Sequence, residues 1–273
     1  MADKIIAPQP SKPQLEASVS VPAESQFEAR KVTAVIYLAS NRPLRVLDFL
    51  TEFHRNWPSQ TLEKTGKEPH RALFRSSRSD FALELHHSPV PQAITEPVAN
   101  STLHWPTAGA ELARNVAYLE LSAATANQTV LTLSCDLTRA IASLLPVTDS
   151  LAVCWLNGPA LNPSKTFIAN AREMFSTGLV PLTLWTAVRW EPKTRSLVTH
   201  GMSQFDAPEL VLSRQPDAAP LMVDYLFQLA LSLVNSRHPV SQEETVESPH
   251  GRLKVKPGRS AQTGKAVLIL EPY

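Results

Sequence analysis

The sequence predicts an α+β protein, in which mixed or antiparallel sheet is covered by helices and a disordered tail precedes the folded part. Short runs of β-branched and aromatic residues alternate with segments whose apolar residues recur at helical spacing. Several runs lie close enough in sequence to form hairpins, which favours antiparallel pairing over a doubly wound sheet. Residues 1–30 contain four prolines among Ser, Gln and Glu, a composition typical of disorder. We therefore expect a proline-rich tail over 1–30 and a single domain over 31–273.

The first part of that domain is expected to contain a strand, a helix and a hairpin. Residues 32–38 are β-branched and aromatic, as in a buried strand. A helix is expected to follow a cap at Asn41, with Pro43 in its first turn, and to stop at Pro58. Its expected apolar face consists of Val46, Leu47, Leu50, Phe53 and Trp57. Residues 71–75 and 81–85 are then expected to pair as a hairpin.

The same order of elements recurs further along the chain. A strand is expected at 116–121, a helix after a cap at Asn127, and a second strand at 151–156. After a short helix around 166–175, residues 182–190 and 196–202 are expected to form a hairpin. The chain would then contain two βαββ-like units, within 31–105 and 112–273.

The last elements expected are a helix and a closing hairpin. Residues 221–234 have a broad apolar face, which predicts a heavily buried helix. Residues 252–256 and 266–270 are expected to pair across the proline and glycines between them.

Composition excludes several classes of function. The net charge is +1, so no strong field would attract nucleic acid or an anionic membrane. The eight glycines are all isolated, which argues against glycine-rich phosphate loops. Cys135 and Cys154 lie in apolar segments and do not form a disulfide framework. Without a signal peptide or a long apolar run, the protein is expected to be cytoplasmic.

A series of short signatures in the second half of the chain resembles the bacterial family known as domain of unknown function 4261. The signatures are Trp155 at a strand end, Phe167, Leu184-Trp185, Thr199-His-Gly201, Phe205 to Leu210, the helix from Leu221 and Thr245-Val246. Asp206 and Ala207 depart from the pattern, because the family usually has a glycine after this phenylalanine. The resemblance implies the fold and a bacterial origin, and it implies no catalytic residues.

Two sets of residues are candidates for a functional site. His200 at a strand end and Glu209 could act as acid and base. Trp185, Arg189, Trp190 and Arg195 lie in or beside the hairpin at 182–202. Trp185 and Trp190 would face opposite sides of a regular strand, so one is expected in the core and the other at the surface. An exposed tryptophan flanked by arginines is typical of a protein contact surface.

Other candidates are interpreted as structural. His86 and His87 are adjacent in a strand, so they would point to opposite faces and could not hold one metal ion together. The two cysteines are expected to pack as small apolar residues. We expect no metal site and no cofactor. The sequence favours a non-enzymatic accessory or immunity-type domain whose partner is another protein, and an enzyme using His200 and Glu209 is the alternative.

Overall fold

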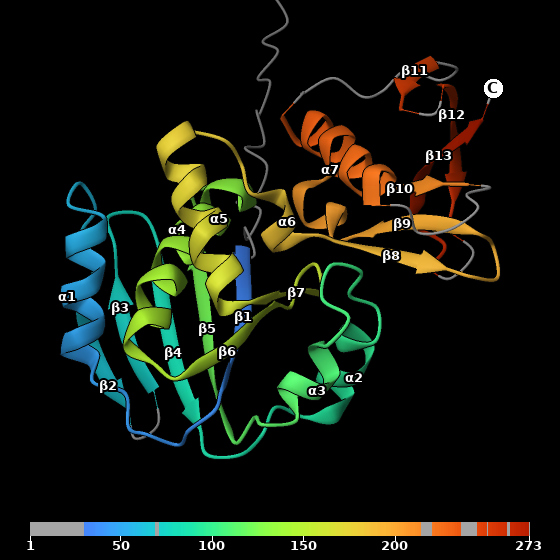
Figure 1. Cartoon of the computed structure of the whole chain (residues 1–273). Coiled ribbons are helices and arrows are strands. Elements are labelled where there is room, and N and C mark those ends of the chain that lie inside the picture. The colour runs from blue at the N-terminus through green and yellow to red at the C-terminus, as the bar shows by residue number, and fades with distance from the viewer. Residues whose placement is uncertain are drawn as a thin grey trace, which may run out of the picture.

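The computed structural model describes residues 30–68, 71–213, 220–235, 245–249, 251–260 and 263–272. It confirms the α+β class, with two mixed or antiparallel sheets and helices packed against them (Figure 1). The expected tail lies outside the described residues, except for Arg30, which begins the first strand.

The first sheet has the strand order β2-β3-β4-β5-β1-β6-β7, and its neighbouring strands are antiparallel. Its strands are β1 (Arg30–Leu38), β2 (Glu63–Glu68), β3 (Arg71–Arg75), β4 (Asp80–His86), β5 (Ala117–Thr125), β6 (Ser150–Trp155) and β7 (Ala160–Pro163). The strand β1 lies between β5 and β6 and is buried on both faces, which accounts for its continuous run of apolar residues.

Helices cover both faces of this sheet. The helices α1 (Val46–Asn56), α4 (Val130–Leu144) and α5 (Ser164–Thr177) pack on the face that carries Val32, Ala34 and Ile36. The shorter helices α2 (Gln92–Ala99) and α3 (Ala108–Leu112) cover the opposite face, which carries Val35 and Tyr37. The segment formed by α4 and the following turn, η1 (Leu145–Val147), has the length and hydropathy of a membrane span, but its burial is that of a core helix.

The second sheet has the order β11-β12-β13-β10-β9-β8, in which β10 and β13 are parallel. Its strands are β8 (Ala187–Glu191), β9 (Ser196–His200), β10 (Glu209–Leu212), β11 (Thr245–Ser248), β12 (Gly251–Arg259) and β13 (Ala266–Pro272). Its helical segments are α6 (Leu182–Trp185), η2 (Met202–Phe205) and α7 (Pro220–Asn235).

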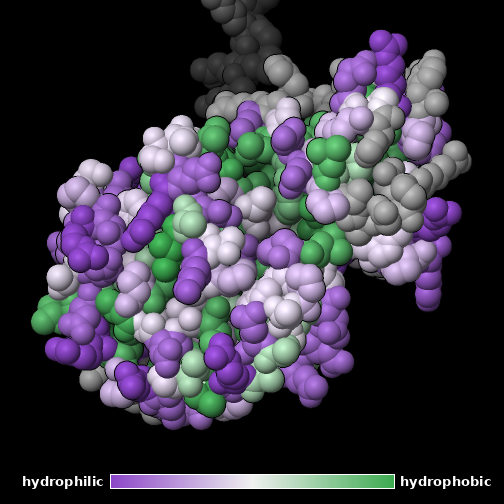
Figure 2. All heavy atoms as spheres, in the orientation of Figure 1, coloured by the Kyte–Doolittle hydropathy of each residue, from purple (hydrophilic) through white to green (hydrophobic). Residues whose placement is uncertain are grey.

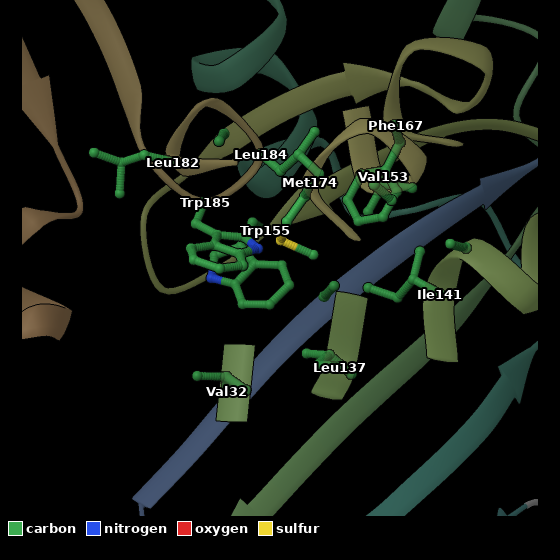
Figure 3. Packing of buried hydrophobic residues seen from close by; sticks show 14 of the residues in the cluster. Val32, Leu137, Ile141, Val153, Trp155, Phe167, Met174, Leu182, Leu184 and Trp185 are labelled. Atoms are coloured by element: carbon green, nitrogen blue, oxygen red, sulfur yellow. The ribbon is translucent and has the colours of Figure 1, made fainter. Parts of the chain in front are cut away.

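The two sheets divide the chain differently from the two expected units. The strands β5 and β6 complete the first sheet on either side of β1, whereas β8 and β9 belong to the second sheet. The expected second unit, 112–273, therefore contributes to both sheets. One hydrophobic cluster extends through α1, α4 and α5 to β8, β9 and α7, and Figure 3 shows part of it.

Three expected element boundaries are wrong. The helix α1 begins at Val46 after Arg45, and Asn41 contacts His87 with its side chain instead of capping the helix. Leu47 is 72% exposed, while Phe49 takes the core position. The helix α4 is capped by Thr129, whose side chain accepts the backbone N–H of Thr132, rather than by Asn127. The expected long strand at 182–190 is one turn of helix, α6, followed by β8.

The helix α7 is less buried than its apolar composition predicts. Only Met222, Leu226 and Ala230 among its residues are fully buried, and Leu221 is 53% exposed. Figure 2 shows hydrophobic residues in the recess beside this helix. Some apolar residues of α7 therefore lie in the core, and others lie on a partly open surface.

Candidate functional site

The joint between the two sheets contains Trp155, Trp185 and Phe205. The Trp185 ring centroid lies 5.9 Å from that of Trp155 and 5.8 Å from that of Phe205. Trp185 is fully buried, and its Nε1 donates to Oγ1 of Thr138 on α4 at 2.8 Å. Figure 3 shows the two indole rings side by side. Trp185 is therefore a core residue, and its expected place in a contact surface is wrong.

A glutamine and two glycines close the same joint. Nε2 of Gln204 donates to the carbonyl oxygens of Trp185 and Gly201, at 3.0 and 2.7 Å, and Oε1 accepts from Nε1 of Trp155 at 3.0 Å. Gly201 has a φ of +113°, and a Cβ there would lie 2.4 Å from Cα of Gly158. A Cβ at Gly158 would lie 1.9 Å from the carbonyl oxygen of Trp185. Only glycine therefore allows the two backbones to approach this closely.

Glu209 stabilises a turn instead of facing a pocket. Its carboxylate accepts from Oγ1 of Thr199 at 2.8 Å and from the backbone N–H groups of Gly201 and Ser203 at 2.9 and 3.3 Å. Oγ1 of Thr199 in turn accepts from the backbone N–H of Leu210 at 2.7 Å. These bonds hold the end of β9, the start of η2 and the start of β10 together. The Glu209 carboxylate therefore has a structural role in this turn.

The side chains of His200 and Glu209 do not interact with each other. Within the described residues, no hydrogen bond or ion pair joins the two side chains. Nε2 of His200 is buried and has no hydrogen-bond partner. Burial, followed by the charge of Arg189, lowers the pKa of His200 to about 4, and Glu191 opposes this effect. The expected acid and base are therefore not assembled as a pair.

The pKa of His200 predicts how stability changes with pH. Because the folded pKa is about 4 and the ordinary value is 6.5, the unfolded chain binds more protons between these values. His200 thus favours the folded state above pH 6.5, and this contribution of at most about 3 kcal/mol is lost as the pH falls towards 4. Denaturant unfolding of wild type and His200→Gln across this range should show a shallower decline in the variant. Parallel declines would contradict the prediction.

The β8–β9 hairpin carries the other three expected contact residues. Trp190 is half-buried and packs against the main hydrophobic cluster. Arg189 is also half-buried, and its Nε has no hydrogen-bond partner. Arg195 is exposed in the turn, with a φ of +49°. The strand β8 lies at the edge of the second sheet, so the hairpin presents these side chains beside an edge strand.

The cysteines and the histidine pair have structural surroundings. Burial raises the pKa of Cys135 to about 11 and that of Cys154 to about 12, which disfavours a reactive thiolate. His86 stacks on Tyr118 with ring centroids 4.2 Å apart, while His87 contacts Asn41. Over the described ranges, no group of three or more His, Cys, Asp and Glu side chains is placed to hold a metal ion.

In comparisons of this chain with family models, curated proteins and solved structures, no match was found. Four of the residues that carry the resemblance nevertheless share a position in the fold. Trp155, Trp185, Gly201 and Phe205 all lie at the joint between the sheets, and Glu209 supports the turn beside it. The sequence did not indicate Gln204 and Gly158, because a single polar residue in the short helix η2 and a single glycine in a turn give no pattern.

Proposed function

We propose that this chain is a non-enzymatic protein-binding domain, and that Arg189, Trp190 and Arg195 on the β8–β9 hairpin form its contact surface. The observation that carries the proposal is that Arg189 and Trp190 lie on β8, the least protected edge strand of the described sheets, and that Arg195 lies in the turn that follows β8. We further propose that the chain is a bacterial, cytoplasmic accessory or immunity-type protein of the family that its signatures resemble. The engagement of Glu209 by three hydrogen-bond donors favours binding over acid–base chemistry.

The other sheet edges in the described structure have features that prevent strand addition. The strand β2 is rich in charge and has an irregular register between Lys64 and Gly66. The strand β7 has four residues and ends in Pro163, and β11 also has only four residues. By contrast, β8 has five residues without proline or an irregular register. An unprotected edge can accept an extended segment of a partner through its main chain.

The side chains around this edge indicate an acidic partner segment. From residue 189 to 195 the hairpin contains Arg189, Lys193 and Arg195 but only one acidic residue, Glu191. Arg195, which is exposed in the turn, is suited to a carboxylate, because arginine binds carboxylates through its planar array of N–H groups. Trp190 lies on the opposite face of β8 from Arg189 and adds a half-buried aromatic side chain to the hairpin. Tryptophan and arginine together dominate measured binding hot spots.

Affinity purification from the native host, quantified by mass spectrometry, tests this proposal. A stoichiometric partner should bind the wild type and be lost from Trp190→Ala and Arg195→Glu. The tryptophan change should weaken binding by about 2 kcal/mol or more. Leu47→Ala and Arg45→Glu are matched controls, because both residues are exposed on or beside α1 in the first sheet's helical layer.

Two results would contradict the proposal. The first is a partner that the hairpin variants retain as well as the controls do. The second is loss of cellular activity in His200→Ala or Glu209→Ala proteins that still fold, together with full activity in Trp190→Ala. That second pattern would support the enzyme hypothesis instead.

A further inference from the structure

A cavity of about 430 Å³ lies at one end of the first sheet, away from the β8–β9 hairpin. It opens between two loops, one joining β1 to α1 and the other joining η1 to β6. The backbone N–H of Ala39 donates to the carbonyl oxygen of Asp149 at 2.8 Å, which holds the two loops together. The volume is within the range of cavities that bind small molecules.

Part of the cavity wall is apolar. Leu85 is half-buried and provides apolar surface there, while Leu38 and Leu119 lie behind it, buried in the core. Leu44 and Val147 add apolar surface from the two loops. A branched aliphatic group of a ligand would be removed from water against these side chains.

The rim of the cavity carries one cation and one anion. Arg42 comes from the first loop and Asp149 from the second, and both side chains are exposed. Throughout the described structure, neither makes an ion pair or a side-chain hydrogen bond. Ser40 and Thr148 place hydroxyl groups beside them. Thr148 donates to the carbonyl oxygen of Leu144, so its hydroxyl oxygen can still accept a hydrogen bond from a ligand.

Two helix ends reinforce this separation of charge. Leu44, two residues after Arg42, immediately precedes Arg45, the N-cap of α1, and the Arg45 side chain does not cap the backbone N–H groups of the helix. Pro146 and Val147 lie in η1, which continues directly from the C-terminus of α4. Helix N-termini favour negative groups and C-termini favour positive groups. The side of the cavity with Arg42 therefore suits a carboxylate, and the side with Asp149 suits an ammonium group.

We propose that this cavity binds a free α-amino acid with an aliphatic side chain, such as L-leucine. The carboxylate would pair with Arg42 and Ser40, and the ammonium group with Asp149 and Thr148. The side chain would contact the partly exposed Leu44, Leu85 and Val147. A fatty acid would leave Asp149 unpaired, and an alkylamine would leave Arg42 unpaired. A zwitterion satisfies both charges, and its aliphatic group fills the apolar part.

Calorimetry with the full chain tests the proposal with four probes. L-Leucine should bind at millimolar concentrations or below. The probes 4-methylpentanoate, which lacks the ammonium group, 3-methylbutylamine, which lacks the carboxylate, and glycine, which lacks the side chain, should each bind at least about tenfold more weakly.

Charge-removing variants give the decisive comparison. In Arg42→Gln, L-leucine should lose its advantage over 3-methylbutylamine, because the carboxylate no longer has its partner. In Asp149→Asn, L-leucine should lose its advantage over 4-methylpentanoate. Arg45→Gln is the matched control, since Arg45 lies on the same loop, pairs with Asp48 and does not line the cavity.

Several outcomes would overturn the proposal. They are the absence of L-leucine binding to folded wild-type protein, equal binding of all four probes, and variants that bind every probe as the wild type does. Thermal melts of the variants show whether the fold is intact, and little change is expected because both residues are exposed.

Discussion

Replacement of Gly201 by alanine should destabilise the protein by about 3 kcal/mol or more, because two penalties coincide at this residue. Its φ of +113° is unfavourable for any residue with a Cβ. The added Cβ would also lie 2.4 Å from Cα of Gly158, and this contact is with backbone that cannot rotate away. Denaturant unfolding at equilibrium measures the loss.

Gly251 separates the two penalties. Its φ of +108° is close to that of Gly201, but a Cβ there would meet no atom within 4 Å. Gly251→Ala should therefore report the backbone penalty alone, about 1–2 kcal/mol. Equal losses in the two variants would show that the backbones of Gly158 and Gly201 are not in close contact.

Replacement of Trp185 by alanine should destabilise the protein by about 3–5 kcal/mol. The change removes a fully buried ring that contacts Trp155 and Phe205, and it leaves Oγ1 of Thr138 without its donor. Thermal or denaturant unfolding measures the effect. Trp185→Phe should lose less, because it keeps most of the apolar volume and removes the hydrogen bond.

Trp190→Ala is the comparison that tests the assignment of the two tryptophans. Trp190 is half-buried, so its loss should destabilise the fold less than the loss of Trp185. If both variants lost the same stability, the distinction between a core tryptophan and a surface tryptophan would be wrong.

The buried elements of the first sheet were predictable from the sequence because their patterns are strong and local. The strand β1 is apolar from Ala34 to Leu38, since helices cover both faces of its sheet. The apolar residues of α4, Leu133, Leu137, Ile141 and Leu144, recur at helical spacing and are all buried. The edge strand β2 was missed, because Glu63–Glu68 is mostly charged and shows no alternation of apolar and polar residues.

Elements that depend on distant contacts could not be predicted in this way. The run from Leu182 to Trp190 has the composition of one long strand. Its first part instead forms a helical turn, in which Trp185 bonds to Thr138 on α4. The expectation that only one of the two tryptophans is in the core was confirmed, although the assumed regular strand was wrong.

The same limit applies to the candidate site. Sequence proximity suggested that His200 and Glu209 could act together. The carboxylate is engaged by Thr199, Gly201 and Ser203, and no sequence pattern indicates the geometry of such a turn. The partition of β5 and β8 into different sheets also depends on strand pairing between distant parts of the chain.

The strand order has a consequence for synthesis on the ribosome. The first described strand, β1, pairs with β5 and β6. Ala34 pairs with Leu121 and Trp155, so this pairing cannot form until both residues have left the ribosomal exit tunnel. The strand β13, the last described strand along the chain, lies between β10 and β12 and supplies the only connection between them within the described sheet. Non-local pairing of this kind forms slowly. Until the partner strands are made, the nascent chain carries apolar strands with open edges, and this is the interval in which a chaperone would protect it from aggregation.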